Sequence, residues 1–170
     1  LFEAVEDAGL VAAAVNIPLY RGRTLHRPTV PLVVGPTRAP KRFFYYSLFE
    51  SDEAGAPLAW RNRAAGTIDA YATASGRWLV TRDGFDLLVF YLSDYDLASH
   101  RHGPDGAGDV LERCDAALGS LVDAAGGLDS FLERYAVLVC SDHGQTPVSE
   151  AATLERRLER VPGTTVTASN

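Results

Sequence analysis

Two short apolar runs, each ending abruptly in polar residues, constrain the fold of this chain more than any other feature. "FDLLVFYL" (85–92) is followed by a group of Asp and His residues, and "YAVLVCSD" (135–142) runs directly into His143. Continuous apolar runs of this length, rich in Val, Phe and Tyr, are typical of strands buried on both faces of a parallel sheet. We therefore expect two buried strands whose carboxyl ends carry polar side chains.

Between these runs, residues 108–127 predict an amphipathic helix that ends at Gly126 and Gly127. The expected buried stripe comprises Leu111, Cys114, Leu118, Leu121, Val122 and Ala125. The rest of the chain predicts a helix closed by Gly9, a buried strand within 11–18, a helix within 64–83, and a final helix over 149–161 with Ser149 as N-cap. This alternation predicts an α/β fold, a three-layer α/β/α sandwich with a mostly parallel sheet, in which ligands bind beyond the carboxyl ends of the strands.

Residues 20–63 interrupt the alternation. The segment is rich in Pro and Gly, with a candidate short strand at "PLVV" (31–34) and the aromatic run "RFFYYSLF" (42–49), so we interpret it as an insertion or cap-like excursion outside the central sheet. It contains eight basic and three acidic residues in a chain of net charge -6. The excess of positive charge fits either a guide for an anionic substrate or a solvated loop. We expect its aromatic residues to pack against the body of the protein and expect no nucleic-acid partner.

Length and composition suit one globular domain, since the chain has 170 residues of which 46% are hydrophobic. It begins at Leu1 and contains no Met, so we expect 1–170 to be a single, partial domain from a longer protein. No apolar run has the roughly 20 residues that cross a bilayer. We expect a cytoplasmic protein, with a secreted or periplasmic location and the oligomeric state left open. Cys114 and Cys140 lie in apolar segments and are expected to be buried thiols.

The polar groups after the two runs suggest metal binding. Asp96 and His100 follow the first run, and Asp142 and His143 follow the second. Either pair alone fits an ion pair on a helical turn or a turn capped by Asp. Together they offer two carboxylate–imidazole pairs at one sheet edge, which suggests two divalent ions, Zn²⁺ or alternatively Mn²⁺. Two such ions can clamp the attacking and leaving oxygens of a displacement at phosphorus.

Both segments resemble a known family. "YLSDYDLASHRHGP" (91–104) resembles the Y-x4-D-x3-H-x2-G-P signature of type I phosphodiesterases and nucleotide pyrophosphatases, in the alkaline phosphatase superfamily. "VLVCSDHGQT" (137–146) is similar to the strand-S-D-H-G motif of that superfamily. The resemblance implies a partial alkaline phosphatase-like core with two metal ions, one bound by Asp96 and His100 and the other by Asp142 and His143. Asp94 and His102 fall at positions that are not ligands.

The sequence departs from the family in ways that affect activity. Its histidines are His26, His100, His102 and His143, so the family's late histidine ligand is absent. The Thr or Ser nucleophile and its neighbouring Asp are expected upstream of Leu1. The resemblance therefore implies a phosphoric ester hydrolase that acts on a small phosphoester or a nucleotide, of which this chain alone is expected to be nearly inactive.

Other functions remain open. A phosphomutase or sulfatase of a sister branch is one alternative, although the Asp-x3-His-x2-Gly-Pro element argues against it. A noncatalytic metal-binding or interaction domain that keeps half of the site is another. A Ser-His-Asp hydrolase is a weaker alternative, because the chain lacks the G-x-S-x-G nucleophile motif.

Overall fold

Strand β1 (Ala12–Val15) lies inside a four-stranded sheet in the computed structural model, which describes residues 1–18, 21–58, 66–82, 84–147, 158 and 161–165. It pairs in parallel with β4 (Arg42–Tyr45) on one side and with β6 (Leu87–Phe90) on the other. Strand β5 (Phe49–Ser51) adds to β4 in the antiparallel direction, giving the order β5-β4-β1-β6. The mostly parallel sheet predicted from the sequence is thus confirmed.

Alternation of side chains along these strands creates two apolar clusters, one on each face of the sheet. Ala12 and Ala14 point into one cluster with Phe2, Phe43 and Phe49. Ala13 and Val15 point into the other with Phe44, Tyr71 and Leu79. Successive strand residues face opposite sides, so a strand covered on both faces is apolar throughout.

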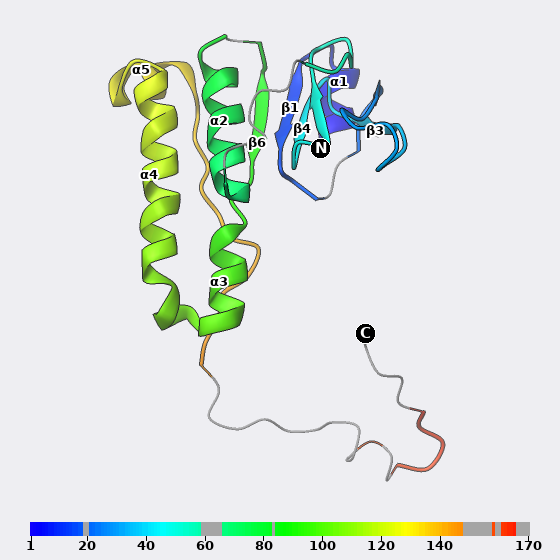
Figure 1. Ribbon diagram of the computed structural model, residues 1–170, viewed down its shortest axis with the longest axis vertical. Coiled ribbons are helices and arrows are strands. Elements are labelled where there is room, and N and C mark those ends of the chain that lie inside the picture. Colours follow the sequence, from blue (N-terminus) through cyan, green and yellow to red (C-terminus); the bar gives the residue numbers. More distant parts are fainter. Residues whose placement is uncertain (19–20, 59–65, 83, 148–157, 159–160, 166–170) are drawn as a thin grey trace.

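Helices cover both faces (Figure 1). Helix α1 (Phe2–Asp7) supplies Phe2 to the first cluster, and α2 (Ile68–Val80) supplies Tyr71, Ala72 and Leu79 to the second. Helix α4 (Gly108–Ala124) lies beside α2. Within residues 84–147 the structure also has α3 (Asp94–His102), the 3-10 helix η1 (Pro104–Ala107) and α5 (Leu128–Arg134). The chain has the predicted α/β/α arrangement.

The structure corrects the interpretation of 20–63. Residues 42–51 form β4 and β5 of the central sheet, so the aromatic run lies in the core and not in a cap. "PLVV" (31–34) is a turn, and the separate hairpin is β2 (Thr24–His26) with β3 (Thr37–Ala39). Phe43 and Phe44 face opposite clusters, which explains why the run is apolar on both sides. Whether 20–63 counts as an insertion in a single domain 1–170 stays a prediction.

The two apolar runs behave differently from each other. The first forms β6 as predicted, but all four of its residues are half-buried because, within the described residues, it has a partner strand on one side only. The second forms no strand, and Val137, Leu138 and Val139 are exposed. Cys140 is exposed as well, so only Cys114 is buried as predicted. The predicted buried strand at 135–142 is therefore wrong for this structure.

The helix over 108–127 is confirmed, but its buried stripe is displaced by one residue at two of the predicted positions, Leu111 and Leu118. Val110, Cys114, Ala117 and Leu121 are buried, whereas Leu111 and Leu118 are exposed. The predicted helix at 149–161, with its Ser149 cap, lies almost entirely outside the described residues. Among the described helices, none combines the length and hydropathy needed to span a membrane.

Two glycines in helices make a matched pair. A Cβ on Gly76 of α2 would lie 2.9 Å from Phe90 Cε2 and 3.0 Å from Leu121 Cδ2, whereas a Cβ on the exposed Gly119 of α4 would meet nothing within 4 Å. The absence of a side chain at Gly76 therefore lets α2 approach both β6 and α4.

We expect Gly119→Ala to raise the free energy of unfolding by about 1 kcal/mol, the usual gain of Ala over Gly in a helix. Gly76→Ala should give a smaller gain or a loss, because Phe90 and Leu121 must shift to accommodate the methyl group. Urea unfolding of both variants measures the difference. Equal stabilisation would show that the close approach at Gly76 has no energetic consequence.

His26, the last residue of β2, is fully buried, and its ring packs against Phe43. Its Nε2–H donates to the carbonyl of Pro40 at 2.6 Å, and its Nδ1 has no hydrogen-bond partner in the described part of the chain. Burial, as the largest influence, lowers the pKa of His26 below its usual 6.5, although the bond to Pro40 acts in the opposite direction. The folded protein therefore holds this imidazole neutral under conditions in which the unfolded chain binds a proton.

Because the unfolded state takes up this proton first, His26 should make the protein less stable as pH falls below 6.5. We expect His26→Gln, which keeps an N–H donor, to reduce the loss of stability between about pH 7.5 and about pH 5. His102→Gln, at an exposed position, is the control. Denaturant unfolding at each pH provides the measurement, and an unchanged slope in the His26 variant would contradict the expectation.

Candidate metal centre

Helix α3 begins just beyond the carboxyl end of β6 and presents Asp96 and His100 one turn apart. His100 Nε2 lies 3.3 Å from Asp96 Oδ1. Gly103, with φ of 76°, ends the helix, and Pro104 starts the 3-10 helix η1. Because Asp96 and His100 are four residues apart on one helix, their carboxylate and imidazole lie on the same side of α3 and close together.

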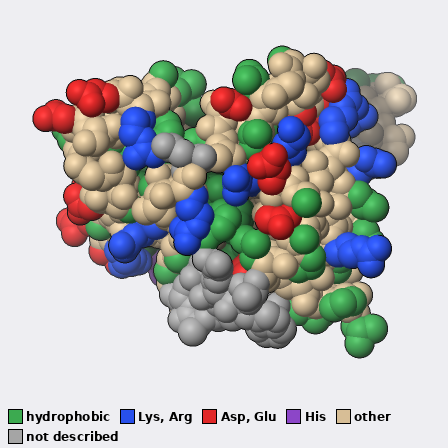
Figure 2. Space-filling view, turned by 90° about the horizontal axis from the view of Figure 1, so that it is seen from above, with side chains coloured by type: hydrophobic (Ala, Val, Ile, Leu, Met, Phe, Trp, Pro, Cys, Tyr) green, Lys and Arg blue, Asp and Glu red, His purple; other side chains and the backbone are tan. Residues whose placement is uncertain are grey.

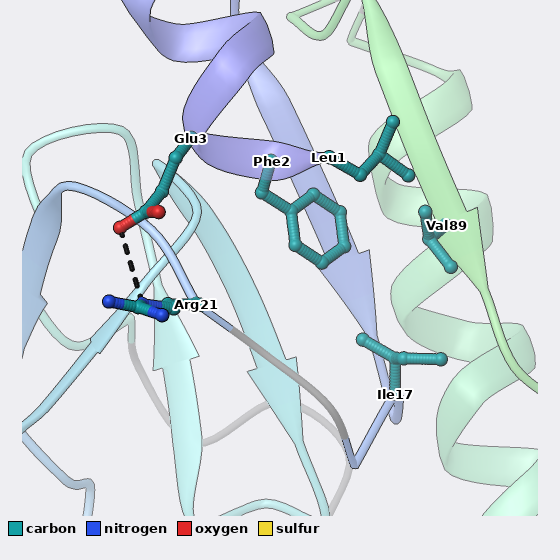
Figure 3. Close-up of a pocket in the computed structure, with 6 residues that line it drawn as sticks. All are labelled: Leu1, Phe2, Glu3, Ile17, Arg21 and Val89. Carbon is teal, nitrogen blue, oxygen red and sulfur yellow. Dashed lines mark ion pairs between the residues drawn. The ribbon is translucent and has the colours of Figure 1, made fainter.

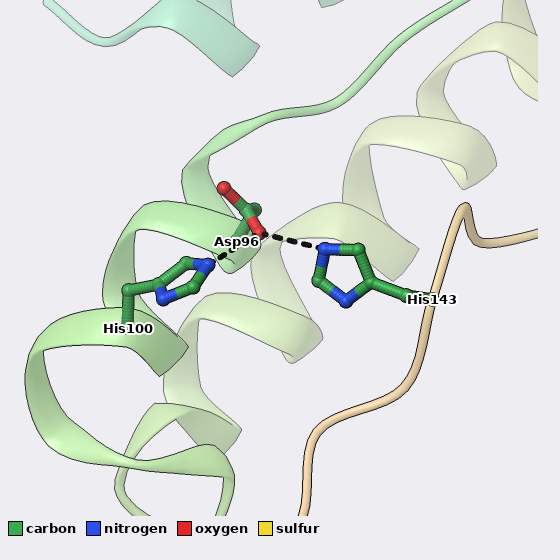
Figure 4. A group of neighbouring side chains, drawn as sticks. All are labelled: Asp96, His100 and His143. Carbon is green, nitrogen blue, oxygen red and sulfur yellow. Dashed lines mark ion pairs between the residues drawn. The ribbon is translucent and has the colours of Figure 1, made fainter. Parts of the chain in front are cut away.

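His143 reaches the same point from a distant part of the chain (Figure 4). Its Nε2 lies 4.0 Å from Asp96 Oδ1, and its ring is 6.3 Å from the His100 ring, measured between centroids. One ligand atom from each of Asp96, His100 and His143 lies within 4.8 Å of the other two. The fold thus assembles one carboxylate and two imidazoles from the two sequence motifs.

These distances are close to those a metal ion requires. Two ligand atoms in a tetrahedral Zn²⁺ site lie about 3.4 Å apart when each is about 2.1 Å from the metal. The separations of 3.3 Å and 4.0 Å from Asp96 Oδ1 bracket this value. The three side chains are between 47% and 61% exposed, so a bound ion would keep positions open to solvent or substrate. Two imidazoles and one carboxylate suit Zn²⁺, Mn²⁺ or Fe²⁺.

Asp142 lies outside this group. Its Oδ1 accepts a hydrogen bond from the backbone N–H of His143, and its Oδ2 is 3.8 Å from His143 Nε2. His143 thus lies close to Asp96 and His100 of the first motif, and also close to its sequence neighbour Asp142. The assignment of one ion to Asp96 and His100 and a second to Asp142 and His143 stays a prediction. Asp94 and His102, expected not to be ligands, do not belong to the three-residue group.

Contacts at both ends position the segment that carries His143. Tyr135 stacks on Phe85 with ring centroids 5.4 Å apart, just before β6 begins. His143 meets Asp96, just after β6 ends. Residues 135–143 therefore run in the same direction as β6, although no ladder is formed between them in the described residues.

The surroundings of the nearby Tyr91 phenol raise its pKa. Partial burial raises the pKa of Tyr91 most, and the carboxylates of Asp96 and Asp142 raise it further. Tyr91 occupies the first position of the signature motif, and its backbone N–H donates to Val15 at the end of β1. The hydroxyl is thus held neutral next to the candidate ligands.

Sequence reasoning missed two residues at this edge of the sheet, Asn16 and Asp69. Asn16 follows β1 with φ of 56°, is fully buried, donates through Nδ2 to Ile68 O and accepts at Oδ1 from Tyr46 N–H. Asp69 in α2 is buried and accepts hydrogen bonds from backbone N–H groups at the start of α3. In the sequence, the only local signal for Asn16 is its position next to the end of a predicted strand. No local signal in the sequence identifies Asp69.

Cavities formed by described residues lie elsewhere on the surface. One of about 400 Å³ is lined by Leu1, Phe2, Glu3, Ile17, Arg21 and Val89, with Glu3 and Arg21 paired at 3.6 Å (Figure 3). A second of about 660 Å³ lies between the start of α2, α3 and α4 and includes Asp94 and Arg101. Neither is lined by Asp96, His100 or His143. The candidate ligands instead lie on the open surface.

Three arginines of residues 20–63, Arg23, Arg38 and Arg42, make side-chain hydrogen bonds within the fold. Arg23 forms a two-bond pair with Asp7 and a third bond to Glu3. Arg42 donates to Gly84 O, and Arg38 donates to Arg23 O. In Figure 2, basic and acidic side chains are interspersed over the face that is shown. This arrangement favours a structural role for these arginines over a guide for anions.

Comparison with known proteins agrees with the two motifs. The family model for type I phosphodiesterase / nucleotide pyrophosphatase matches residues 2–167. No curated protein and no solved structure matched the chain. Because the family model covers nearly the whole sequence, including both segments that meet at Asp96, the chain belongs to the type I phosphodiesterase/nucleotide pyrophosphatase family.

Proposed function

We propose that this chain is the central part of a metal-dependent phosphoric ester hydrolase and supplies metal ligands for cleavage of a phosphodiester or pyrophosphate bond. The observation that carries the proposal is the meeting of Asp96, His100 and His143 from two separate motifs at the carboxyl side of β6. Membership of the family supports the same reaction class. The substrate class that we propose is a small phosphoester or a nucleotide.

Each residue has a defined part in the proposal. Asp96 offers a negatively charged oxygen, and the imidazoles of His100 and His143 offer neutral nitrogens, in positions that face one another. Asp142 extends the donor set from the side of His143. When bound, divalent ions at such residues neutralise phosphoryl oxygens and lower the pKa of a coordinated hydroxyl group. The family's two-ion arrangement would add residues beyond the four named here.

Zn²⁺ binding to the purified chain tests the ligand set. We expect His100→Ala and His143→Ala each to weaken Zn²⁺ binding by more than about tenfold, since each removes one of three clustered ligands. Asp142→Ala should have a smaller effect if the ion sits among the three clustered atoms. Isothermal titration calorimetry measures affinity and stoichiometry.

His102→Ala is the matched control, because this histidine is on the same helix but outside the group. Equal losses for Asp142→Ala and His143→Ala, with two ions bound, would favour the paired arrangement over a shared ion. Absence of Zn²⁺ uptake, or uptake unaffected by both His100→Ala and His143→Ala, would refute a metal role for these residues.

Hydrolysis of a nitrophenyl phosphodiester tests the reaction class. We expect the chain of residues 1–170 with Zn²⁺ to be nearly inactive, since it has no histidine after His143 to complete the family's ligands. In the longer protein that we propose contains it, His100→Ala should lower kcat/KM by at least about 100-fold. Enzyme-like turnover by the isolated chain would contradict the first expectation. Full activity of the longer variant would contradict the second.

A further inference from the structure

The start of α3 is capped from another helix. Ser93 occupies the N-cap position but its side chain makes no capping bond, and its buried Oγ has no partner among the described residues. Asp69 Oδ1 instead accepts the backbone N–H of Ser93 at 2.7 Å and that of Asp94 at 3.2 Å. A carboxylate here satisfies free N–H groups and complements the positive end of the helix dipole.

Hydrogen bonds between α2 and α3 are donated from both helices, and Asp69 also contacts α4. Asp94 Oδ2 accepts the backbone N–H of Asp69 in the first turn of α2, at 3.3 Å. Cys114 of α4 donates its S–H to Asp69 Oδ2 at 3.4 Å. The Asp69 side chain is buried, with the residue only 7% exposed. Its single carboxylate contacts both α3 and α4. Charge-assisted bonds of this kind are stronger than bonds between neutral groups.

Helix α3 contacts η1 and α4, but few of its side chains are fully buried. Ser99 is its only buried residue, and Leu97 is 45% exposed. Most helices are held by a buried apolar face, and α3 lacks one. The polar bonds at its first turn therefore carry an unusual share of the restraint on the helix that presents Asp96 and His100.

We infer that Asp69 is a positioning residue for the candidate metal centre: its carboxylate anchors the first turn of α3 and so sets the direction in which Asp96 and His100 point. The inference rests on the proposed function in that metal binding is one of its readouts. Mutation of residues that orient metal ligands without touching the metal typically lowers metal affinity by about 10-fold to 100-fold. Asp69 would act in this way through the backbone of α3.

The experiment compares Asp69→Ala with Asp69→Asn in the whole chain. Ala removes both acceptors, whereas Asn keeps one oxygen for the two N–H groups and loses the charge. We expect Ala to weaken Zn²⁺ binding by about tenfold or more and Asn by less. Amide hydrogen exchange at Ser93 and Asp94, measured by NMR without metal, should quicken strongly in Asp69→Ala and weakly in Asp69→Asn. Should Asp69→Ala not fold, Asp69→Asn provides both readouts.

Asp86→Ala is the control for loss of a similar bond. Asp86 Oδ2 accepts the N–H of Val11 at 2.8 Å, also between distant residues, but before β6 and away from α3. Cys114→Ala tests the other oxygen of Asp69 and should leave exchange at Ser93 largely unchanged. Thermal unfolding of each variant separates a loss of global stability from a local effect.

Weaker Zn²⁺ binding and faster exchange in the Asp69 variants, with neither in Asp86→Ala at a comparable loss of stability, would support the inference. Wild-type affinity in Asp69→Ala, or the same loss of affinity in Asp86→Ala, would overturn it. If the wild type bound no Zn²⁺, the proposed function would fail while the exchange data still decided the role of Asp69. In that case unchanged exchange at Ser93 and Asp94 would overturn the inference, and faster exchange would support it.

Discussion

Parallel pairing of β1 with both β4 and β6 is the constraint on which the rest of the structure depends. All four β1 residues are fully buried, and three of them are alanines, whose small side chains let α1 and α2 pack close to opposite faces of the strand. Because β1, β4 and β6 run the same way, their carboxyl ends meet at one edge. Asn16, Tyr46 and α3 all follow at that edge, and the candidate ligands gather next to it.

Polar bonds connect the elements that meet at this edge. Asn16 ties the end of β1 to the start of α2 and to the turn after β4, and Asp69 ties α2 to α3 and α4. Burial, chiefly, raises the pKa of Asp69, and burial likewise raises the pKa of Cys114 to about 11, so the thiol remains a hydrogen-bond donor at neutral pH. Buried polar groups in such networks are costly unless they are paired, which is why they fix one specific arrangement.

Residues in β4 and in 135–140 show where sequence patterns succeed and where they mislead. The sequence predicts that Phe43 and Phe44 belong to a cap-like excursion, because the segment is rich in Pro and Gly. Pairing of β4 with β1 instead places both side chains in the core. "YAVLVC" has the composition of a buried strand, but it forms no strand with the described residues, and Val137, Leu138 and Val139 are exposed. Strand propensity depends on which neighbours are available, so it identifies a segment that fits a sheet without identifying its partner.

The candidate metal ligands and their chemistry can be predicted without a structure. The spacing of Asp96 and His100 on one helical turn is a local property, and Asp142 and His143 are adjacent in the sequence. Both pairs can therefore be identified from the sequence. By contrast, the approach of His143 to Asp96 and His100, and the capping of α3 by Asp69, are visible only in the folded chain. Both contacts join residues far apart in the chain, 24 positions for Asp69 and Ser93, and such contacts depend on how β6, α2 and the segment after α5 are placed together.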